Sequence, residues 1–117
     1  MRKMTEFDEA WNAIVQYANG REEIFTLCRH IGNRIVRANG NEIVVISSRP
    51  ISVLTERVLT KVNFQRAWNQ LIRSGELYMN DLDPDLRGKR AIIMKLISVV
   101  PGISNSCDKR LRLIYGI

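Results

Sequence analysis

The sequence predicts an α+β fold: a small antiparallel β-sheet, arranged as a meander, with three helices packed on one face. Apolar residues recur at helical spacing in three separate segments, whereas residues 23–47 alternate as strands do and contain the hairpin signal Asn39-Gly40. A chain of 117 residues with 45% hydrophobic residues is expected to form one domain around a single core. A winged helix is the alternative, because helix, hairpin and helix also follow one another in that fold.

The first helix is expected over residues 5–19. Thr5 precedes acidic residues in the first turn, which is typical of a helix N-terminus, and Asn19-Gly20 ends the helix. Its apolar face consists of Phe7, Ala10, Trp11, Ile14, Val15 and Ala18. This face, together with Phe64 and Trp68 of a later helix, is expected to lie in the core.

The meander is expected to follow the first helix. Its predicted strands are residues 24–29, 34–38 and 43–46. The turns between them are predicted at Ile31-Gly32-Asn33 and Asn39-Gly40. A helix over residues 24–36 is the alternative for the first part of this segment, since its apolar residues also fit a 3.6-residue period.

The second helix is expected to begin with Asn63 as its N-cap and to end at Ser74-Gly75. Before it, Ser47-Ser48-Arg49-Pro50 breaks the third strand, and residues 51–59 form a further strand or an extended loop. A turn of helix is expected near Asn80-Asp81.

A third helix is expected over residues 91–100 and ends at Pro101-Gly102. The tail, residues 108–117, alternates as a strand does and is predicted to join an edge of the sheet.

The whole chain has a net charge of +6, and its positive charge is concentrated in two blocks. Residues 29–73 carry eight basic and two acidic residues, and residues 87–117 carry seven basic residues and one acidic residue. The other two segments, residues 1–28 and 74–86, are net acidic. Most of the cations in the first block are arginines, whose planar guanidinium pairs with phosphate. This distribution favours binding of a polyanion on one face of the domain.

Several short segments resemble a known class of module. They are Ile24-Phe25-Thr26, Asn39-Gly40-Asn41, the run Val62–Trp68 and Gly75-Glu76-Leu77, with the last helix after them. In their order and apolar spacing they are similar to small α+β accessory modules found beside catalytic domains in restriction-type and other DNA-processing proteins. The resemblance covers residues 22–102, implies DNA as a partner and transfers no catalytic residue.

No combination of residues predicts a catalytic or metal site. His30 is the single histidine, and on a strand it would share a face with Cys28, but no third residue completes a catalytic group. The segment Asp81–Asp85 resembles the start of a calcium loop, yet Pro84 interrupts it and Ile92 stands where that loop needs glutamate. The chain is therefore expected to be non-catalytic and to need no metal or cofactor.

Cys28 and Cys107 lie far apart in the sequence and form no Cys-x-x-Cys pair. The basic residues near the N-terminus are not followed by an apolar segment, so no secretory signal is expected. The prediction is a cytoplasmic protein with two reduced, inert thiols and no membrane partner.

These observations predict a DNA-binding module that contacts backbone phosphates. The predicted contacts are Arg34, Arg37, Arg49, Arg57, Lys89 and Arg90. Further candidates are Arg29 and, as an alternative basic surface, the tail residues Lys109, Arg110 and Arg112. On a regular strand Arg34 and Arg37 would face opposite sides of the sheet unless a bulge intervenes. The alternative function is protein interaction or homo-oligomerisation, in which the acidic Asp81–Asp85 loop pairs with the basic sheet of another copy.

Overall fold

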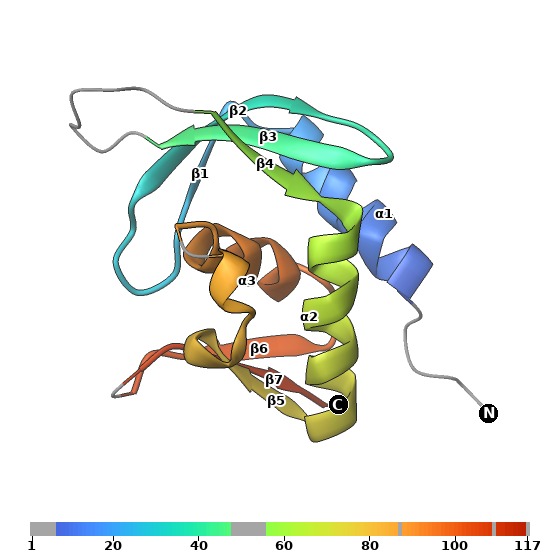
Figure 1. Cartoon of the computed structure of the whole chain (residues 1–117), viewed down its shortest axis with the longest axis vertical. Helices are drawn as coiled ribbons and strands as arrows, with labels where there is room; N and C mark the ends of the chain where they lie inside the picture. Colours follow the sequence, from blue (N-terminus) through green and yellow to red (C-terminus); the bar gives the residue numbers. More distant parts are fainter. Residues whose placement is uncertain (1–6, 48–55, 87, 109, 117) are drawn as a thin grey trace.

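A computed structural model describes residues 7–47, 56–86, 88–108 and 110–116 of the chain. Within these residues the chain forms two antiparallel sheets and three α-helices (Figure 1). The helices are α1 (Phe7–Asn19), α2 (Lys61–Ser74) and α3 (Arg90–Ser98). The α+β class predicted from the sequence is confirmed, with α3 lying between the two sheets.

The first sheet is the predicted meander, extended by a fourth strand. Its strands are β1 (Glu23–Phe25), β2 (Gly32–Ala38), β3 (Glu42–Ser47) and β4 (Glu56–Thr60), in that spatial order. The hairpin at Asn39-Gly40 is confirmed: the Asn39 side chain accepts hydrogen bonds from the backbone N–H of Asn41 and Glu42, at 2.8 and 3.1 Å. The helical alternative for residues 24–36 is therefore wrong.

The turn predicted at Ile31-Gly32-Asn33 is wrong, because Gly32 already begins β2. The chain turns earlier, at residues 27–29, where Thr26 closes the loop. The Thr26 hydroxyl accepts from the N–H of Ile31 at 2.9 Å, and its backbone exchanges hydrogen bonds with Ile31 and His30. Cys28 and His30 take left-handed backbone angles in this turn, with φ of 69° and 57°. They do not lie on a strand.

A β-bulge in β2 decides which way its arginines face. Arg34 pairs with Ile46 and Arg37 with Val44, so Val36 is an extra residue without a partner on β3. Since residues 44 and 46 are two apart on one strand, Arg34 and Arg37 lie on the same face of the sheet. The regular-strand expectation that they point to opposite faces is thus reversed. This face is the outer one, because the core-facing residues of β3 are Ile43 and Val45.

The N-cap of helix α2 lies three residues before the predicted one, Asn63. Thr60 caps it: its hydroxyl accepts from the N–H of Asn63 at 3.2 Å, and the Asn63 side chain accepts from the N–H of Thr60 at 3.1 Å. Asn63 is thus the third helical residue of a capping box and not the cap. Gly75 ends the helix as predicted, with a left-handed φ of 82° and its N–H bonded to Leu71 O.

The tail does not join the first sheet. It forms β7 (Arg112–Tyr115), the central strand of a second sheet, between β5 (Glu76–Tyr78) and β6 (Ile103–Ser106). The predicted turn of helix after β5 is present as a 3-10 helix, η1 (Met79–Asp81), and a second one follows, η2 (Pro84–Leu86). Leu77 and Leu113 pair across β5 and β7 and are fully buried, so this sheet contributes its own apolar face to the core.

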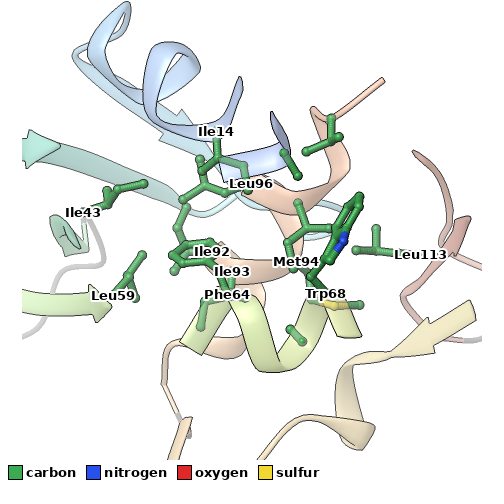
Figure 2. Close-up of a cluster of buried hydrophobic side chains, with 14 of the residues drawn as sticks. Ile14, Ile43, Leu59, Phe64, Trp68, Ile92, Ile93, Met94, Leu96 and Leu113 are labelled. Carbon is green, nitrogen blue, oxygen red and sulfur yellow. The ribbon is translucent and has the colours of Figure 1, made fainter. Parts of the chain in front are cut away.

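One hydrophobic core fills the space between the sheets (Figure 2). Trp11 and Trp68 are each 3% exposed and Phe64 is fully buried, which confirms their predicted place in the core. The buried indole of Trp11 donates to Gly40 O at 2.9 Å. Helix α3 is buried over most of its circumference, as expected for a helix enclosed by other elements. None of the helices in the described part of the chain has the length and apolar composition to cross a membrane.

Candidate anion-binding site

The structure separates the six predicted phosphate contacts. Arg34 and Arg37 are exposed on the outer face of the first sheet. Arg57 is opposite Val45 in the β3–β4 pairing and so faces the inner side, where it is partly buried. Arg90 opens α3, also partly buried, while Arg49 lies outside the described residues.

A cavity of about 570 Å³ lies behind the inner face, at the end of the first sheet away from the Asn39-Gly40 hairpin. Four parts of the chain line it: the turn after β1 with the adjoining ends of β2, β3 and β4, the start of η1, the start of α3, and the segment between β6 and β7. These parts lie on one side of the molecule in Figure 1. Its volume is in the usual range of small-molecule sites.

Four arginines line this cavity, and no carboxylate of the described residues does. Arg57 and Arg90 belong to the predicted set, and Arg29 and Arg110 to the further candidates. Arg29 and Arg110 are exposed and so mark the mouth, whereas the partly buried Arg57 and Arg90 form the interior. Among the described residues none of the four pairs with an acidic side chain. Four like charges without a counter-ion in one concave space favour an anion there.

The guanidinium of Arg90 also has a hydrogen-bond donor without an acceptor among the described residues. Its Nε is buried and has no hydrogen-bond partner within the described part of the chain. Buried polar groups are nearly always paired, because a buried donor without an acceptor costs on the order of 1–3 kcal/mol, and more when the group is charged. Because this Nε has almost no accessible surface it does not face the cavity, and an anion there would have to contact another part of the guanidinium.

Gly88 lets the start of α3 approach Arg57 closely. A Cβ on Gly88 would lie 3.6 Å from Nε and 3.9 Å from Nη2 of Arg57, and the φ of Gly88 is +83°. Residues from β4 and from the turn before α3 are thereby brought together. Of the predicted turn Gly88-Lys89-Arg90, Gly88 and Arg90 line the cavity, and Lys89 is not among the described residues that do.

A disulfide bond joins two walls of the cavity. Cys28, in the turn after β1, is bonded to Cys107, which follows β6, and their Cα atoms are 5.8 Å apart. The prediction of two reduced, separate thiols is therefore wrong. A separation of 79 residues hid the pair in the sequence, and only the packing of the two sheets around α3 brings the turns together. The bond also removes Cys28 as a nucleophile beside His30.

The tail arginines differ from one another. The Arg110 guanidinium lies over the Tyr78 ring, 4.8 Å from its centroid, and lines the cavity. Arg112 instead donates to Glu76 at 2.8 Å and to the Tyr78 hydroxyl at 3.4 Å. The hydrogen bond to Glu76 has the largest effect, and together with the one to Tyr78 it raises the pKa of Arg112 above its ordinary value. The Arg112 side chain is thus held within the second sheet by Glu76 and Tyr78. Lys109 lies outside the described residues.

The acidic loop is occupied with local contacts. Asp83 forms an ion pair with Arg66 at 3.3 Å and accepts from the N–H of Asp85 at 3.0 Å. Asp81 accepts from the N–H of Tyr78 at 3.1 Å. Within the described residues no three metal-ligating side chains gather at one place. The loop therefore has the properties of a helix-capping segment and not of a calcium site.

No protein-family model, curated protein or solved structure matches this chain. The arginine-lined cavity is consequently the feature from which its function is inferred.

Proposed function

We propose that this protein is a non-catalytic DNA-binding module and that the arginine-lined cavity is its principal phosphate-binding site. The observation that carries the proposal is the convergence of Arg29, Arg57, Arg90 and Arg110 on one cavity without an acidic partner among the described residues. The resemblance to accessory modules of restriction-type and other DNA-processing proteins supports DNA as the source of the phosphates. A cytoplasmic location belongs to the same proposal.

The chemistry of arginine fits phosphate better than a generic anion. A guanidinium presents several N–H donors in one plane and binds phosphate oxygens two at a time. Arg57 and Arg90 are partly buried, so each charge is less screened by solvent than an exposed one. Each charge-assisted hydrogen bond to a phosphate then contributes roughly 1.5–3 kcal/mol. Two such interior contacts and two at the mouth would hold a phosphate backbone without reading its sequence.

Arg34 and Arg37 contribute less in this proposal. They lie on the outer face of the first sheet, opposite to the face that carries Arg57, so one straight segment of DNA cannot touch both sets. Arg37 also pairs with Glu42 at 3.2 Å, although such exposed pairs are weak. They act at most as a secondary contact.

The alternative, an interaction or homo-oligomerisation domain, needs acidic side chains that are available to another copy. Asp81 and Asp83 already accept hydrogen bonds inside their own loop, and Asp83 pairs with Arg66. The described contacts therefore favour nucleic acid over a self-complementary interface.

The test is a titration of fluorescently labelled duplex DNA, followed by anisotropy at several salt concentrations in non-reducing buffer. If two to four phosphates are contacted, the logarithm of the binding constant should fall with the logarithm of salt concentration with a slope of about −2 to −4. No binding at low salt, or a slope near zero, would contradict the proposal. A salt-sensitive dimer in size-exclusion chromatography, without DNA affinity, would support the oligomerisation alternative.

A further inference from the structure

The cavity is concave, so among the phosphates of a nucleic acid those at a strand end can enter it most deeply. A volume of about 570 Å³ admits a group that projects from the end of a strand, or a detached nucleotide. The two interior arginines, Arg57 and Arg90, are less exposed than those at the mouth and are reached most easily by such a projecting group.

The number of charges also distinguishes a terminal phosphate from an internal one. A phosphomonoester carries about −1.5 to −2 charges at pH 7, because its second pKa is about 6. An internal phosphodiester carries one negative charge. Four arginines, with no carboxylate among the described lining residues, match the dianion better than the monoanion.

Apolar residues form part of the remaining lining, beside the polar Thr26, Asn33 and Ser47, and suit the organic part of a nucleotide. Leu27, Ile31, Met79, Ile92 and Leu111 line the same cavity as the arginines. Small-molecule sites commonly combine an apolar wall with a few polar groups that fix orientation. Inorganic phosphate would use the arginines alone, whereas a nucleotide would use both parts.

We infer that the cavity binds a nucleotide through its phosphomonoester, with Arg57 and Arg90 holding the phosphate and the apolar wall receiving the sugar or base. This inference rests on the proposed function, because it names the group that the same cavity selects. Two sources share the chemistry: the 5′-phosphorylated end of a strand and a free nucleoside 5′-monophosphate.

The test compares two single-stranded oligonucleotides of one sequence, one with a 5′-phosphate and one with a 5′-hydroxyl, and a nucleoside 5′-monophosphate. At pH 7.5 we expect the phosphorylated strand to bind about tenfold more tightly than the hydroxyl strand. At pH 5 most of the terminal phosphate is singly charged, so this advantage should shrink severalfold. A monophosphate that binds as tightly as the phosphorylated strand identifies the free nucleotide as the ligand, and a much weaker one identifies the strand end.

Each negative outcome has its own meaning. Equal affinity of the two strands overturns the inference and leaves DNA binding in place. Binding of the monophosphate without binding of any oligonucleotide overturns the proposed function and leaves the cavity as a nucleotide site. Binding of none of the three probes overturns the inference, and the duplex titration then decides the proposed function separately.

Variants locate the effect. Arg90→Gln should remove the advantage of the 5′-phosphate, about tenfold, and Arg90→Lys should restore part of it, since lysine keeps the charge and loses the planar fork. Arg73→Gln is the matched control: Arg73 is exposed at the end of α2 and lies outside the cavity. Melting temperatures establish that the variants fold. If Arg73→Gln lowers the advantage as much as Arg90→Gln does, the inference is wrong.

Discussion

The two faces of the first sheet carry arginines in different surroundings. On the outer face Arg34 and Arg37 are exposed, and Arg37 is paired with Glu42 at 3.2 Å. On the inner face Arg57 points into a cavity that also receives Arg90, and no carboxylate of the described residues lines it. Arginine is the basic residue on both faces. Enclosure and the lack of a counter-charge, which arise from packing, distinguish a binding arginine from a solvated one.

The largest effect should come from the core on which both faces depend. Trp68 is 3% exposed and lies in edge contact with Tyr115, with ring centroids 6.0 Å apart. Trp68→Ala should lower the free energy of unfolding by roughly 3–5 kcal/mol, measured by chemical denaturation, and both faces should lose DNA binding together. A variant that folds with unchanged stability and loses only the ligand would show that Trp68 belongs to the site.

The disulfide tests the cavity side specifically. Replacing Cys28 and Cys107 together by serine should lower stability by about 2–4 kcal/mol, because the bond closes a loop of 79 residues in the unfolded chain. It should also weaken phosphate binding, since the bond joins two walls of the cavity. Dithiothreitol should have the same effects on the unmodified protein and none on the double variant. The comparison fails if reductant changes neither the melting temperature nor the affinity.

This redox dependence bears on the compartment. Cytosolic thiols are normally kept reduced, so a cytoplasmic location requires that the Cys28–Cys107 bond resists reduction there.

Two glycines allow the effect of backbone strain to be distinguished from an effect on the binding site. Gly88 and Gly75 have nearly equal φ, +83° and +82°, but only Gly88 lies beside Arg57. Alanine at either position should cost roughly 1–2 kcal/mol of stability, because the left-handed region is unfavourable for residues with a Cβ. A Cβ at Gly88 would only touch Arg57, at 3.6 and 3.9 Å, but relief of the backbone strain there would shift the start of α3 beside Arg57, so only Gly88→Ala should also lower the affinity for DNA. An equal loss of affinity in both variants would assign the effect to strain.

The smallest effect is expected on the outer face. Replacing Arg34 and Arg37 together by alanine should change the free energy of unfolding by about 0.5 kcal/mol per residue or less. The affinity for DNA should fall less than in Arg57→Gln, although the bulge at Val36 aligns the two side chains. Anisotropy titrations of the three proteins make this comparison. A larger loss in the double variant would move the principal site to the outer face.

Local patterns in the sequence were sufficient for most elements. The spacing of Ala10, Trp11 and Ile14 predicts α1, and the left-handed Gly75 stops α2 where expected. The hairpin at Asn39-Gly40 is likewise local, because the Asn39 side chain bonds to residues two and three positions later. The N-cap of α2 was displaced by three residues, since Thr60 and Asn63 both belong to the capping box and spacing alone does not rank them.

The helices, the meander and the two basic blocks follow from local sequence, because periodicity, turn chemistry and charge are properties of neighbouring residues. Four features appear only in the folded chain: the second sheet, the bulge at Val36, the Cys28–Cys107 bond and the meeting of Arg57 with Arg90 at one cavity. Each of these depends on contacts between segments far apart in the chain. Such contacts follow from how the sheets pack around α3, and no local spacing encodes them.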